Sequence, residues 1–415
     1  RNTRTTNSKN AHRNRKNTPQ RKTQHSTNAN PTQTTSMRIS IVTPFYPPDH
    51  GGIATHVQKL TKQLAKKNKI QIITCTPGKA QNLPGNPQIV KIPSVIPPPV
   101  PYQTLTSFRI PKTIIPAINA IKAFNPDIIH LHGHHYPINW ITAKHLKETP
   151  KILTMHGMYA LNPNVQGGKT LTEEIFNQTI FKWFLNKLNA IIALTPTIAN
   201  YARKYTQKPI YIIPNGIDTE KYLKNIHRKT EYREKYDLPQ DKTIVLFRGR
   251  FTHVKGVLEF TATAKTLSRK RSDLYFLAVG GGPLEKAVRK RLQTIENAKT
   301  LPWTPLELIH ELYIASDIYV LPSKWEALPI TVLEAMAANL AIVATKVGGV
   351  PDILTPYHKK VLIEKANPNE IAQGIEKATK LVHEEKFSQP PAEYIRQYDW
   401  SQISIRIQET YHNIL

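Results

Sequence analysis

Short apolar runs alternate with amphipathic segments along the chain from residue 37 onward. Between most of these runs, apolar residues recur at helical spacing, for example over residues 53–67 and 171–188. Alternating strands and helices predict parallel sheets that are covered by helices on both faces. The apolar runs form two series, which predict two doubly wound domains with strands at 39–43, 70–75, 127–132, 151–155 and 190–194, and then at 243–248, 274–279, 317–321 and 340–344.

The first 36 residues differ from the rest, because they are rich in Asn, Thr, Arg and Lys and almost free of large apolar side chains. Such a segment cannot bury a core, so a disordered basic tail is predicted for residues 1–36. We expect one Rossmann-like α/β domain over residues 37–214 and a second over 215–395. Because doubly wound sheets bind ligands at the carboxyl ends of their strands, a site is expected in a cleft between the two domains.

Charge and cysteine content narrow the class of protein. The 415-residue chain has a formal net charge of +28 and one cysteine, Cys75, which ends a predicted strand and is expected to be buried rather than nucleophilic. A single cysteine allows no intramolecular disulfide, and no apolar run is long enough to span a membrane. We therefore expect a cytoplasmic protein, with peripheral attachment to the inner face of the cell membrane left open.

The basic balance favours anionic partners, which include nucleotides, nucleic acid and anionic membrane surfaces. The sequence has neither zinc-finger spacing nor an RNP-type aromatic motif, so specific binding of nucleic acid is not expected.

The most informative stretch is 323–338, where Glu326 and Glu334 lie eight positions apart across a predicted helix start. Pro329 is expected at the first helical position, which suits its fixed φ and missing N–H. A helix N-terminus offers free N–H groups and a positive dipole end, which suit a phosphate. The stretch fits a ligand with a central diphosphate and a hydroxyl-rich sugar on each side. The alternative is an ordinary helix with one glutamate near its start and another on its solvent face.

Other candidate groups follow the ends of predicted strands. Gly51 and Gly52 precede a predicted helix and allow a ligand to approach the backbone closely. Arg250 and Lys255 offer two cations for a diphosphate, and His156 follows another strand end. The alternatives without a ligand are a tight glycine turn, a solvated basic pair and a packed structural histidine.

Four histidines gather near one strand end, which raises the question of a metal site. They are His130, His132, His134 and His135. No matching set of acids or cysteines completes a site in the sequence, so no metal is expected.

Taken together, these segments resemble glycosyltransferase family four, the retaining enzymes of the GT-B fold. The resemblance covers about residues 37–415 and is more specific in the second domain than in the first. Ala327 and Asn339 stand where the family commonly has glycine, and asparagine is the next best residue for a left-handed helix cap. The matching strings are Pro214-Asn215-Gly216-Ile217-Asp218, Gly249-Arg250 with Lys255-Gly256, Val279-Gly280-Gly281-Gly282-Pro283-Leu284, Ala315-Ser316-Asp317 leading to Leu321-Pro322-Ser323, the stretch from Glu326 to Glu334, and Val347-Gly348-Gly349-Val350-Pro351.

The resemblance implies where the parts of a GT-B enzyme lie in this chain. The acceptor side would be residues 37–214, the nucleotide-sugar site 215–395, and residues 396–415 would form a helix that crosses back to the first domain. Arg250 and Lys255 would hold the donor diphosphate. The remaining implied positions are Glu326 on the donor sugar, Glu334 on the ribose, His156 beside the transferred sugar, the backbone near Leu328, Pro329 and Ile330 on the phosphates, and Gly51 and Gly52 beside the phosphates and the acceptor.

The sequence therefore predicts a retaining glycosyltransferase that moves a sugar from a nucleotide-diphosphate donor to a lipid-linked, saccharide or small-molecule acceptor. Cations and a helix dipole would stabilise the leaving group, so no metal or cofactor is expected. The alternatives are another GT-B activity, such as a nucleotide-sugar epimerase or a phosphorylase, and a non-catalytic polyanion-binding protein. Residues 53–67 are a candidate contact with anionic membranes, the alternative being an ordinary helix packed on the core.

Overall fold

The computed structural model describes residues 36–49, 51–96, 109–158, 171–384 and 392–415. The predicted disordered tail lies outside the described residues except for Ser36.

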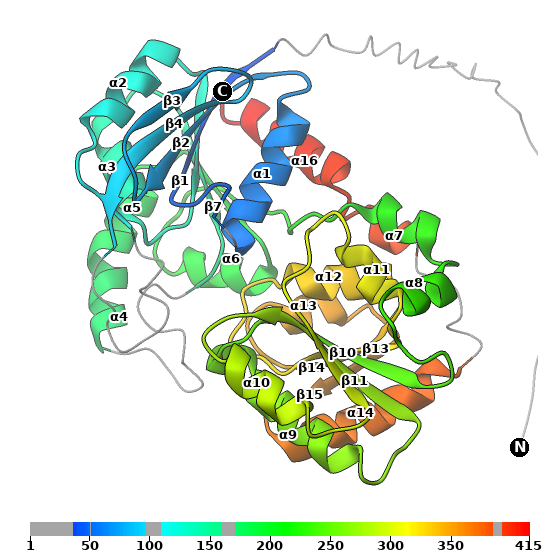
Figure 1. The fold of residues 1–415 in the computed structure, drawn as a ribbon. Coiled ribbons are helices and arrows are strands. Elements are labelled where there is room, and N and C mark those ends of the chain that lie inside the picture. The colour runs from blue at the N-terminus through cyan, green and yellow to red at the C-terminus, as the bar shows by residue number, and fades with distance from the viewer. Residues whose placement is uncertain (1–35, 50, 97–108, 159–170, 385–391) are drawn as a thin grey trace, which may run out of the picture. The chain divides into compact units, whose positions relative to one another are not determined.

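The first sheet is mainly parallel and occupies residues 38–212 (Figure 1). Its main order is β4-β2-β1-β6-β7-β8-β9, and β3 and β5 pair with β4 in antiparallel orientation. Strand addition therefore reverses direction between β1 and β6. The strands are β1 (Arg38–Thr43), β2 (Lys69–Thr76), β3 (Gln81–Leu83), β4 (Gln88–Val95), β5 (Ile110–Pro111), β6 (Ile128–His132), β7 (Lys151–Met155), β8 (Ala190–Ala193) and β9 (Ile210–Ile212).

Helices connect these strands, as a parallel sheet requires. They are α1 (Gly52–Leu64), α2 (Ile115–Phe124), α3 (Pro137–His145), α4 (Leu171–Phe176), the π-helical turn η2 (Asn177–Phe181), α5 (Lys182–Asn186) and α6 (Pro196–Arg203).

The second sheet is parallel throughout its described pairs and has the order β12-β11-β10-β13-β14-β15. This is the common order of doubly wound nucleotide-binding sheets, with its reversal between β10 and β13. The two doubly wound domains predicted from the sequence are thus confirmed. The strands are β10 (Thr243–Arg250), β11 (Leu274–Gly281), β12 (Ala298–Leu301), β13 (Ile318–Leu321), β14 (Ala341–Thr345) and β15 (Lys360–Ile363).

The helical segments of the second half precede, connect and follow these strands. They are α7 (Thr219–Asn225), α8 (Lys229–Lys235), the 3-10 turn η3 (His253–Lys255), α9 (Val257–Leu267), α10 (Glu285–Leu292), α11 (Ile309–Ile314), α12 (Ile330–Ala337), α13 (Val350–Leu354), α14 (Pro368–Val382), α15 (Ala392–Arg396) and α16 (Trp400–His412).

Three predicted local features need correction. The helix expected over 171–188 is divided by η2, whose wider turn keeps Phe176 and Phe181 on the buried side although they are five positions apart. The helix expected over 53–67 ends earlier, at Leu64. Pro329 is not the first helical residue: its ψ of 118° is extended, so it is the N-cap and α12 begins at Ile330.

The end of the chain packs against the first sheet. Trp400 and Ile403 of α16 share a core with Val57, Leu60 and Leu64 of α1. A parallel β-bridge joins Ile217 to Asp399 just before α16 begins. The apolar face of α1 is therefore buried in the protein.

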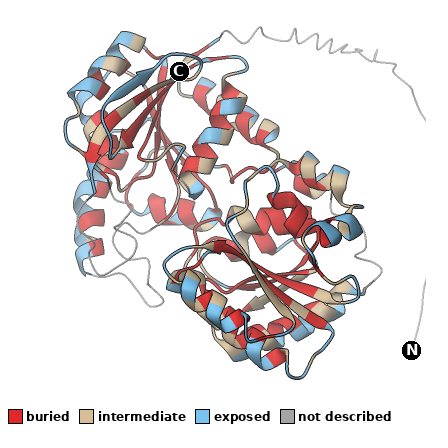
Figure 2. Cartoon of the chain, viewed as in Figure 1, coloured by how far each residue is buried: buried red, intermediate tan, exposed pale blue. Residues whose placement is uncertain are grey.

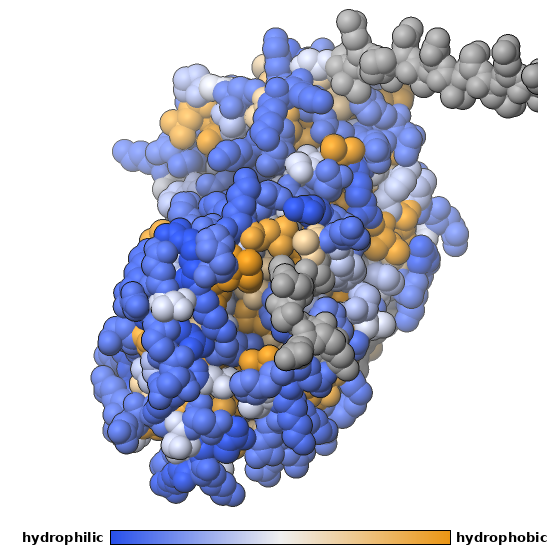
Figure 3. All heavy atoms as spheres, turned by 90° about the vertical axis from the view of Figure 1, so that its right-hand side faces the viewer, coloured by the Kyte–Doolittle hydropathy of each residue, from blue (hydrophilic) through white to orange (hydrophobic). Residues whose placement is uncertain are grey.

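The helices differ in how far they are buried (Figure 2). α12 is buried almost along its whole length, from Val332 to Ala337, because it lies between the sheet and other helices. On the face seen in Figure 3 the surface is mostly hydrophilic, and apolar residues gather in separate patches. None of the described helices combines the length and apolar character needed to cross a membrane. Cys75 is buried, and burial raises the pKa of its thiol to about 12, which fits a structural residue.

Candidate active site

At the reversal point of the second sheet, Lys255 lies beside Glu326. Lys255 is one of the two cations that the sequence predicts for a diphosphate, and Glu326 is the first of the two predicted glutamates. Lys255 ends the turn that follows β10, and Glu326 lies in the loop that follows β13, the neighbouring strand. Lys255 Nζ lies 2.5 Å from Glu326 Oε1, which also accepts a hydrogen bond of 2.7 Å from Ser323 Oγ. Glu326 is 4% exposed, and these two donors fix the orientation of its carboxylate.

The second glutamate also has a cationic partner. Glu334, in the second turn of α12, accepts a 3.2 Å hydrogen bond from Nη1 of Arg248 on β10. Burial lowers the pKa of Arg248, but the charge of Glu334 and the nearby tyrosines together outweigh it, so the pKa lies above its ordinary value. The guanidinium carbon of Arg248 lies 5.5 Å from the ring centroid of Trp303, a half-exposed side chain beyond β12. A buried carboxylate and an aromatic face thus flank the same arginine.

The start of α12 is tied to the rest of the site through its loop. Asn215 Nδ2 donates to the carbonyl oxygen of Leu328 at 2.9 Å, and the first backbone acceptor inside the turn is Pro329, which receives the N–H of Val332. The N–H groups at Ile330 and Thr331 precede any intrahelical acceptor, as at every helix start. They are available to an anion.

Two glycines allow the segments of this site to approach each other. Gly348 has φ of +52°, and a Cβ there would lie 1.6 Å from the carbonyl oxygen of Glu326. Gly256 has φ of +69°, and a Cβ there would lie 1.9 Å from the carbonyl oxygen of Pro322. Both contacts are with backbone, which a side-chain movement cannot relieve. The glycine turns predicted from the sequence therefore hold the Glu326 loop in place.

Replacing Gly348 by alanine should lower both turnover, by at least about tenfold, and the melting temperature. The added methyl group must displace the backbone of Glu326, and misplacement by about 1 Å can cost a hundredfold in rate. Gly85→Ala is a matched control, because Gly85 also has positive φ but its Cβ would meet nothing closer than 3.5 Å. Parental turnover in Gly348→Ala would contradict this account of the loop.

The reversal point of the first sheet lies between β1 and β6. Gly51 is the N-cap of α1 with φ of +141°, Gly52 is its first residue, and a Cβ at either would meet nothing within 4 Å. His56 lies on the next turn of α1, and His132 ends β6. His156 follows β7, the next strand in the sheet. The open glycine backbone and these three histidines thus come from adjoining elements.

The rings of these three histidines lie close to one another. The ring centroid of His56 lies 5.4 Å from that of His132 and 4.8 Å from that of His156. His132 Nδ1 and His156 Nε2 are 3.0 Å apart, at hydrogen-bonding distance. Burial is the largest cause that lowers the pKa of each ring, to about 4 for His56, with the neighbouring histidines adding to the effect for His132 and His156. All three are therefore neutral at pH 7.

Two contacts join the histidine side to the glutamate side. Asn215 Oδ1 lies 2.9 Å from His56 Nδ1, while Asn215 Nδ2 bonds Leu328 of the α12 loop. A Cβ on Gly157 would lie 3.2 Å from the ring of Trp325, the residue before Glu326. His156 thus lies one residue from a contact with the Glu326 loop.

The predicted site residues do not all behave alike. The structure brings Lys255, Glu326 and the start of α12 together, with Glu334 further along the same helix. Arg250 ends β10 in an exposed position, and its guanidinium forms no ion pair with any described residue. The sequence argument missed Arg248, Asn215 and His56. Arg248 could have been found, because it is two positions from Arg250 on one strand and so projects from the same face. Asn215 lies in one of the strings that match the family. No feature of the sequence distinguishes His56.

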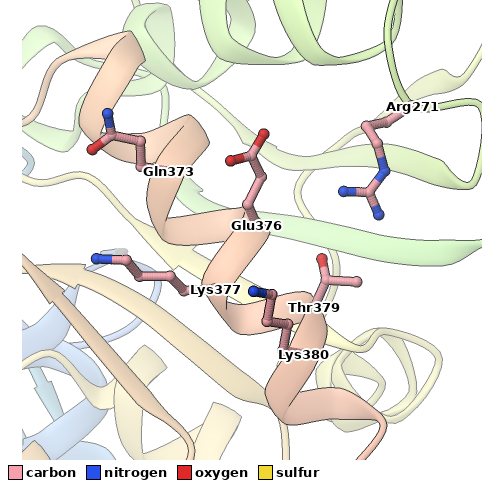
Figure 4. Close-up of a pocket in the computed structure, with 6 residues that line it drawn as sticks. All are labelled: Arg271, Gln373, Glu376, Lys377, Thr379 and Lys380. Carbon is pink, nitrogen blue, oxygen red and sulfur yellow. The ribbon is translucent and has the colours of Figure 1, made fainter.

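A hollow on α14 is unrelated to these groups. Figure 4 shows Arg271 opposite Glu376 and Lys380 of that helix. Arg271 pairs with Asp273 just before β11 begins, so the hollow lies at the amino end of that strand. Ligands of doubly wound sheets bind at the opposite ends.

Comparison with known proteins follows the two halves of the chain. The family described as Glycosyltransferase Family 4 matches residues 50–221, and that described as Glycosyl transferases group 1 matches residues 228–397. TuaC of Bacillus subtilis, named for teichuronic acid biosynthesis, is 25% identical over 63% of this chain and 62% of its own length. An alpha-maltose-1-phosphate synthase of Mycolicibacterium smegmatis is 26% identical over 79% of this chain and 84% of its own length.

The solved structures agree on the fold. Alr3699/HepE of Anabaena in complex with UDP aligns with a TM-score of 0.68 at 14% identity, covering 91% of this chain and all of the other. Such a likeness shows the fold, and it confirms the predicted GT-B architecture.

Proposed function

Because this chain belongs to the family-four glycosyltransferases of the GT-B fold, we propose that it transfers a sugar from a nucleotide-diphosphate donor with retention of configuration. One observation carries the proposal: two carboxylate–cation pairs flank the start of α12 at the reversal point of a doubly wound sheet. The acceptor is proposed to be a lipid-linked, saccharide or small-molecule hydroxyl compound.

The proposal assigns a role to each charged group. Departure of a nucleoside diphosphate develops negative charge, which preorganised cations and a helix dipole stabilise. Lys255 and Arg250 would bind the diphosphate together with the backbone at Leu328–Ile330. Glu326, held by Lys255 and Ser323 through one oxygen, would accept hydrogen bonds from donor sugar hydroxyls through the other. Glu334 would accept those of the ribose.

The first domain would complete the site. The open backbone at Gly51 and Gly52 lies at the start of a helix, where an anion is favoured. His156 is neutral and half-buried, so it can donate or accept one hydrogen bond with a sugar hydroxyl without carrying charge. The Anabaena neighbour has been solved with UDP and with UDP-glucose, which supports a donor of this class.

A panel of UDP-, GDP- and ADP-sugars, scored by thermal shift and by donor hydrolysis, tests the proposal. One nucleotide class should raise the melting temperature and be hydrolysed slowly without an acceptor. The Arg250→Ala variant should lose both responses. Conversion of the donor into an epimeric nucleotide sugar, or no response to any member of the panel, would contradict transferase function.

Turnover should survive excess chelator. The proposed site neutralises the diphosphate with Lys255, Arg250 and a helix N-terminus, and its two carboxylates already have cationic partners. Activity measured with and without EDTA should therefore agree within about twofold, well below the hundredfold effect of losing one charge donor. Complete loss that magnesium or manganese restores would count against the site.

Peripheral membrane contact is a further part of the proposal, and the structure limits how it would occur. Val57, Leu60 and Leu64 of α1 are buried in the core, so they are not available for insertion. Lys59 pairs with Asp218 at 2.6 Å, which leaves Lys62, Lys66 and Lys67 as the exposed cations of this segment. Contact would therefore be electrostatic.

The protein should co-sediment with anionic liposomes, less so as salt rises, and not with neutral ones. The Lys62→Glu/Lys66→Glu variant should bind more weakly than Lys377→Glu/Lys380→Glu, which changes total charge equally on exposed residues of α14. Equal recovery of both variants would remove α1 as the contact.

A further inference from the structure

Three histidines from separate elements converge on one point. They are His56 of α1, His132 at the end of β6 and His156 after β7. Each offers one ring nitrogen, and the three nitrogens lie within 4.8 Å of one another. His56 and His132 are 1% and 0% exposed, while His156 is half-buried. The group is therefore closed on one side and accessible on the other.

The hydrogen bond to Asn215 determines the tautomer of His56. Asn215 Nδ2 donates to Leu328, which identifies its other atom as the acceptor oxygen. His56 Nδ1, 2.9 Å from that oxygen, must therefore carry the proton. The lone pair is then on Nε2, which is buried and has no hydrogen-bond partner among the described residues. A metal-binding histidine is usually oriented in this way, by a hydrogen bond from its other nitrogen.

His132 has the same property. Its Nδ1 is 3.0 Å from His156 Nε2, and its Nε2 is buried without a partner within the described ranges. When Nδ1 carries the proton, the lone pair of His132 lies on Nε2, and that of His156 lies on the Nε2 that accepts this hydrogen bond. His156 becomes a ligand when an ion takes the place of that hydrogen bond. Two buried acceptors without donors are costly, and a cation would satisfy both.

We propose that His56, His132 and His156 form a three-histidine site for a transition-metal ion such as Zn²⁺. Three neutral imidazoles with an open fourth position are the donor set of many zinc centres, and imidazole suits Zn²⁺, Cu²⁺ and Ni²⁺ rather than Mg²⁺. No metal is expected from the sequence alone, but that expectation does not take His56 into account.

The position of the site has a consequence for activity, and this consequence rests on the proposed function. His156 would contact the transferred sugar, so a metal there would compete with the donor instead of assisting it. Such an ion inhibits, and the enzyme remains active in chelator. Affinity for the nucleotide sugar that responds in the donor panel, measured first without metal, tests the proposed function alone. The same measurement with saturating Zn²⁺ should then show weaker binding, and unchanged affinity would overturn the overlap.

Titration of the full chain with Co²⁺ tests the metal site itself. One equivalent should give the visible absorption of tetrahedral cobalt, and Zn²⁺ should abolish it. His132→Asn and His156→Asn should each weaken binding at least about tenfold, the loss that even an outer partner of a metal site causes. His145→Asn, which removes an exposed histidine of α3, controls for surface binding and should behave as the parent.

Circular dichroism shows which variants fold, and His156→Asn is the safer one because its ring is half-buried. No tetrahedral cobalt spectrum in the parent, or equal affinity in the parent and in a folded His156→Asn variant, would overturn the proposal.

Discussion

Replacing Lys255 or Arg250 by alanine should cut turnover about a hundredfold, the loss expected when one preorganised charge donor is removed from a developing anion. Arg250 gives the cleaner result. Its guanidinium is exposed and forms no ion pair with any described residue, so its removal should leave the melting temperature unchanged. Lys255→Ala also leaves Glu326 with Ser323 as its remaining side-chain donor among the described residues, so some destabilisation should accompany the loss of turnover.

Lys324→Ala is the matched control for Lys255→Ala. Lys324 lies two residues from Glu326 and is also paired with a carboxylate, that of Glu259 at 3.0 Å. It has no place in the proposed diphosphate site, so turnover should stay close to that of the parent. Near-normal turnover in both Lys255→Ala and Arg250→Ala would remove the diphosphate assignment, whatever Lys324→Ala does.

The strands were predictable because each is a short apolar run in a sheet covered on both faces. Every strand predicted from the sequence is present, and β7 has the predicted bounds. The missed strands lie away from the sheet centres. β4 contains Pro93 and alternates buried with half-buried residues, and β15 is an edge strand that is mostly half-buried, so neither reads as a continuous apolar run.

The candidate site was only half predictable, and the reason is the same at each missed residue. Lys255 and Glu326 were found because each follows a strand end, and the strand ends at a reversal point meet in any doubly wound sheet. His56 lies inside an amphipathic helix, where one buried polar residue looks like any other. The role of His56 in the site depends on its hydrogen bond with Asn215, which is 159 positions away in the sequence. Contacts of that range follow from how the domains pack, which local pattern does not contain.

The free energy of unfolding should fall steeply as pH is lowered from about 7 to 5, because several histidines are buried in their neutral form. Above pH 7 it should not depend on those histidines. Burial lowers the pKa of His56 and His135 to about 4 and that of His130 to about 3. In the unfolded chain each would titrate near 6.5, so below that pH the unfolded state binds more protons than the folded state. The stability that the neutral histidines provide is therefore present above pH 6.5 and lost as pH falls toward the folded pKa.

Each such histidine should reduce the free energy of unfolding by about 1.4 kcal/mol per pH unit in that window. The contributions of several buried histidines add, so the total loss of stability should be large. Urea unfolding at pH 5, 6, 7 and 8 measures the slope. His130→Gln should reduce it, because His130 is fully buried between Tyr411 and Thr154 and the variant cannot titrate. The exposed His145→Gln should leave the slope unchanged. Equal stability at pH 5 and pH 7 would show that the buried histidines accept protons without unfolding, and that the folded protein supplies them with a solvent or anion partner.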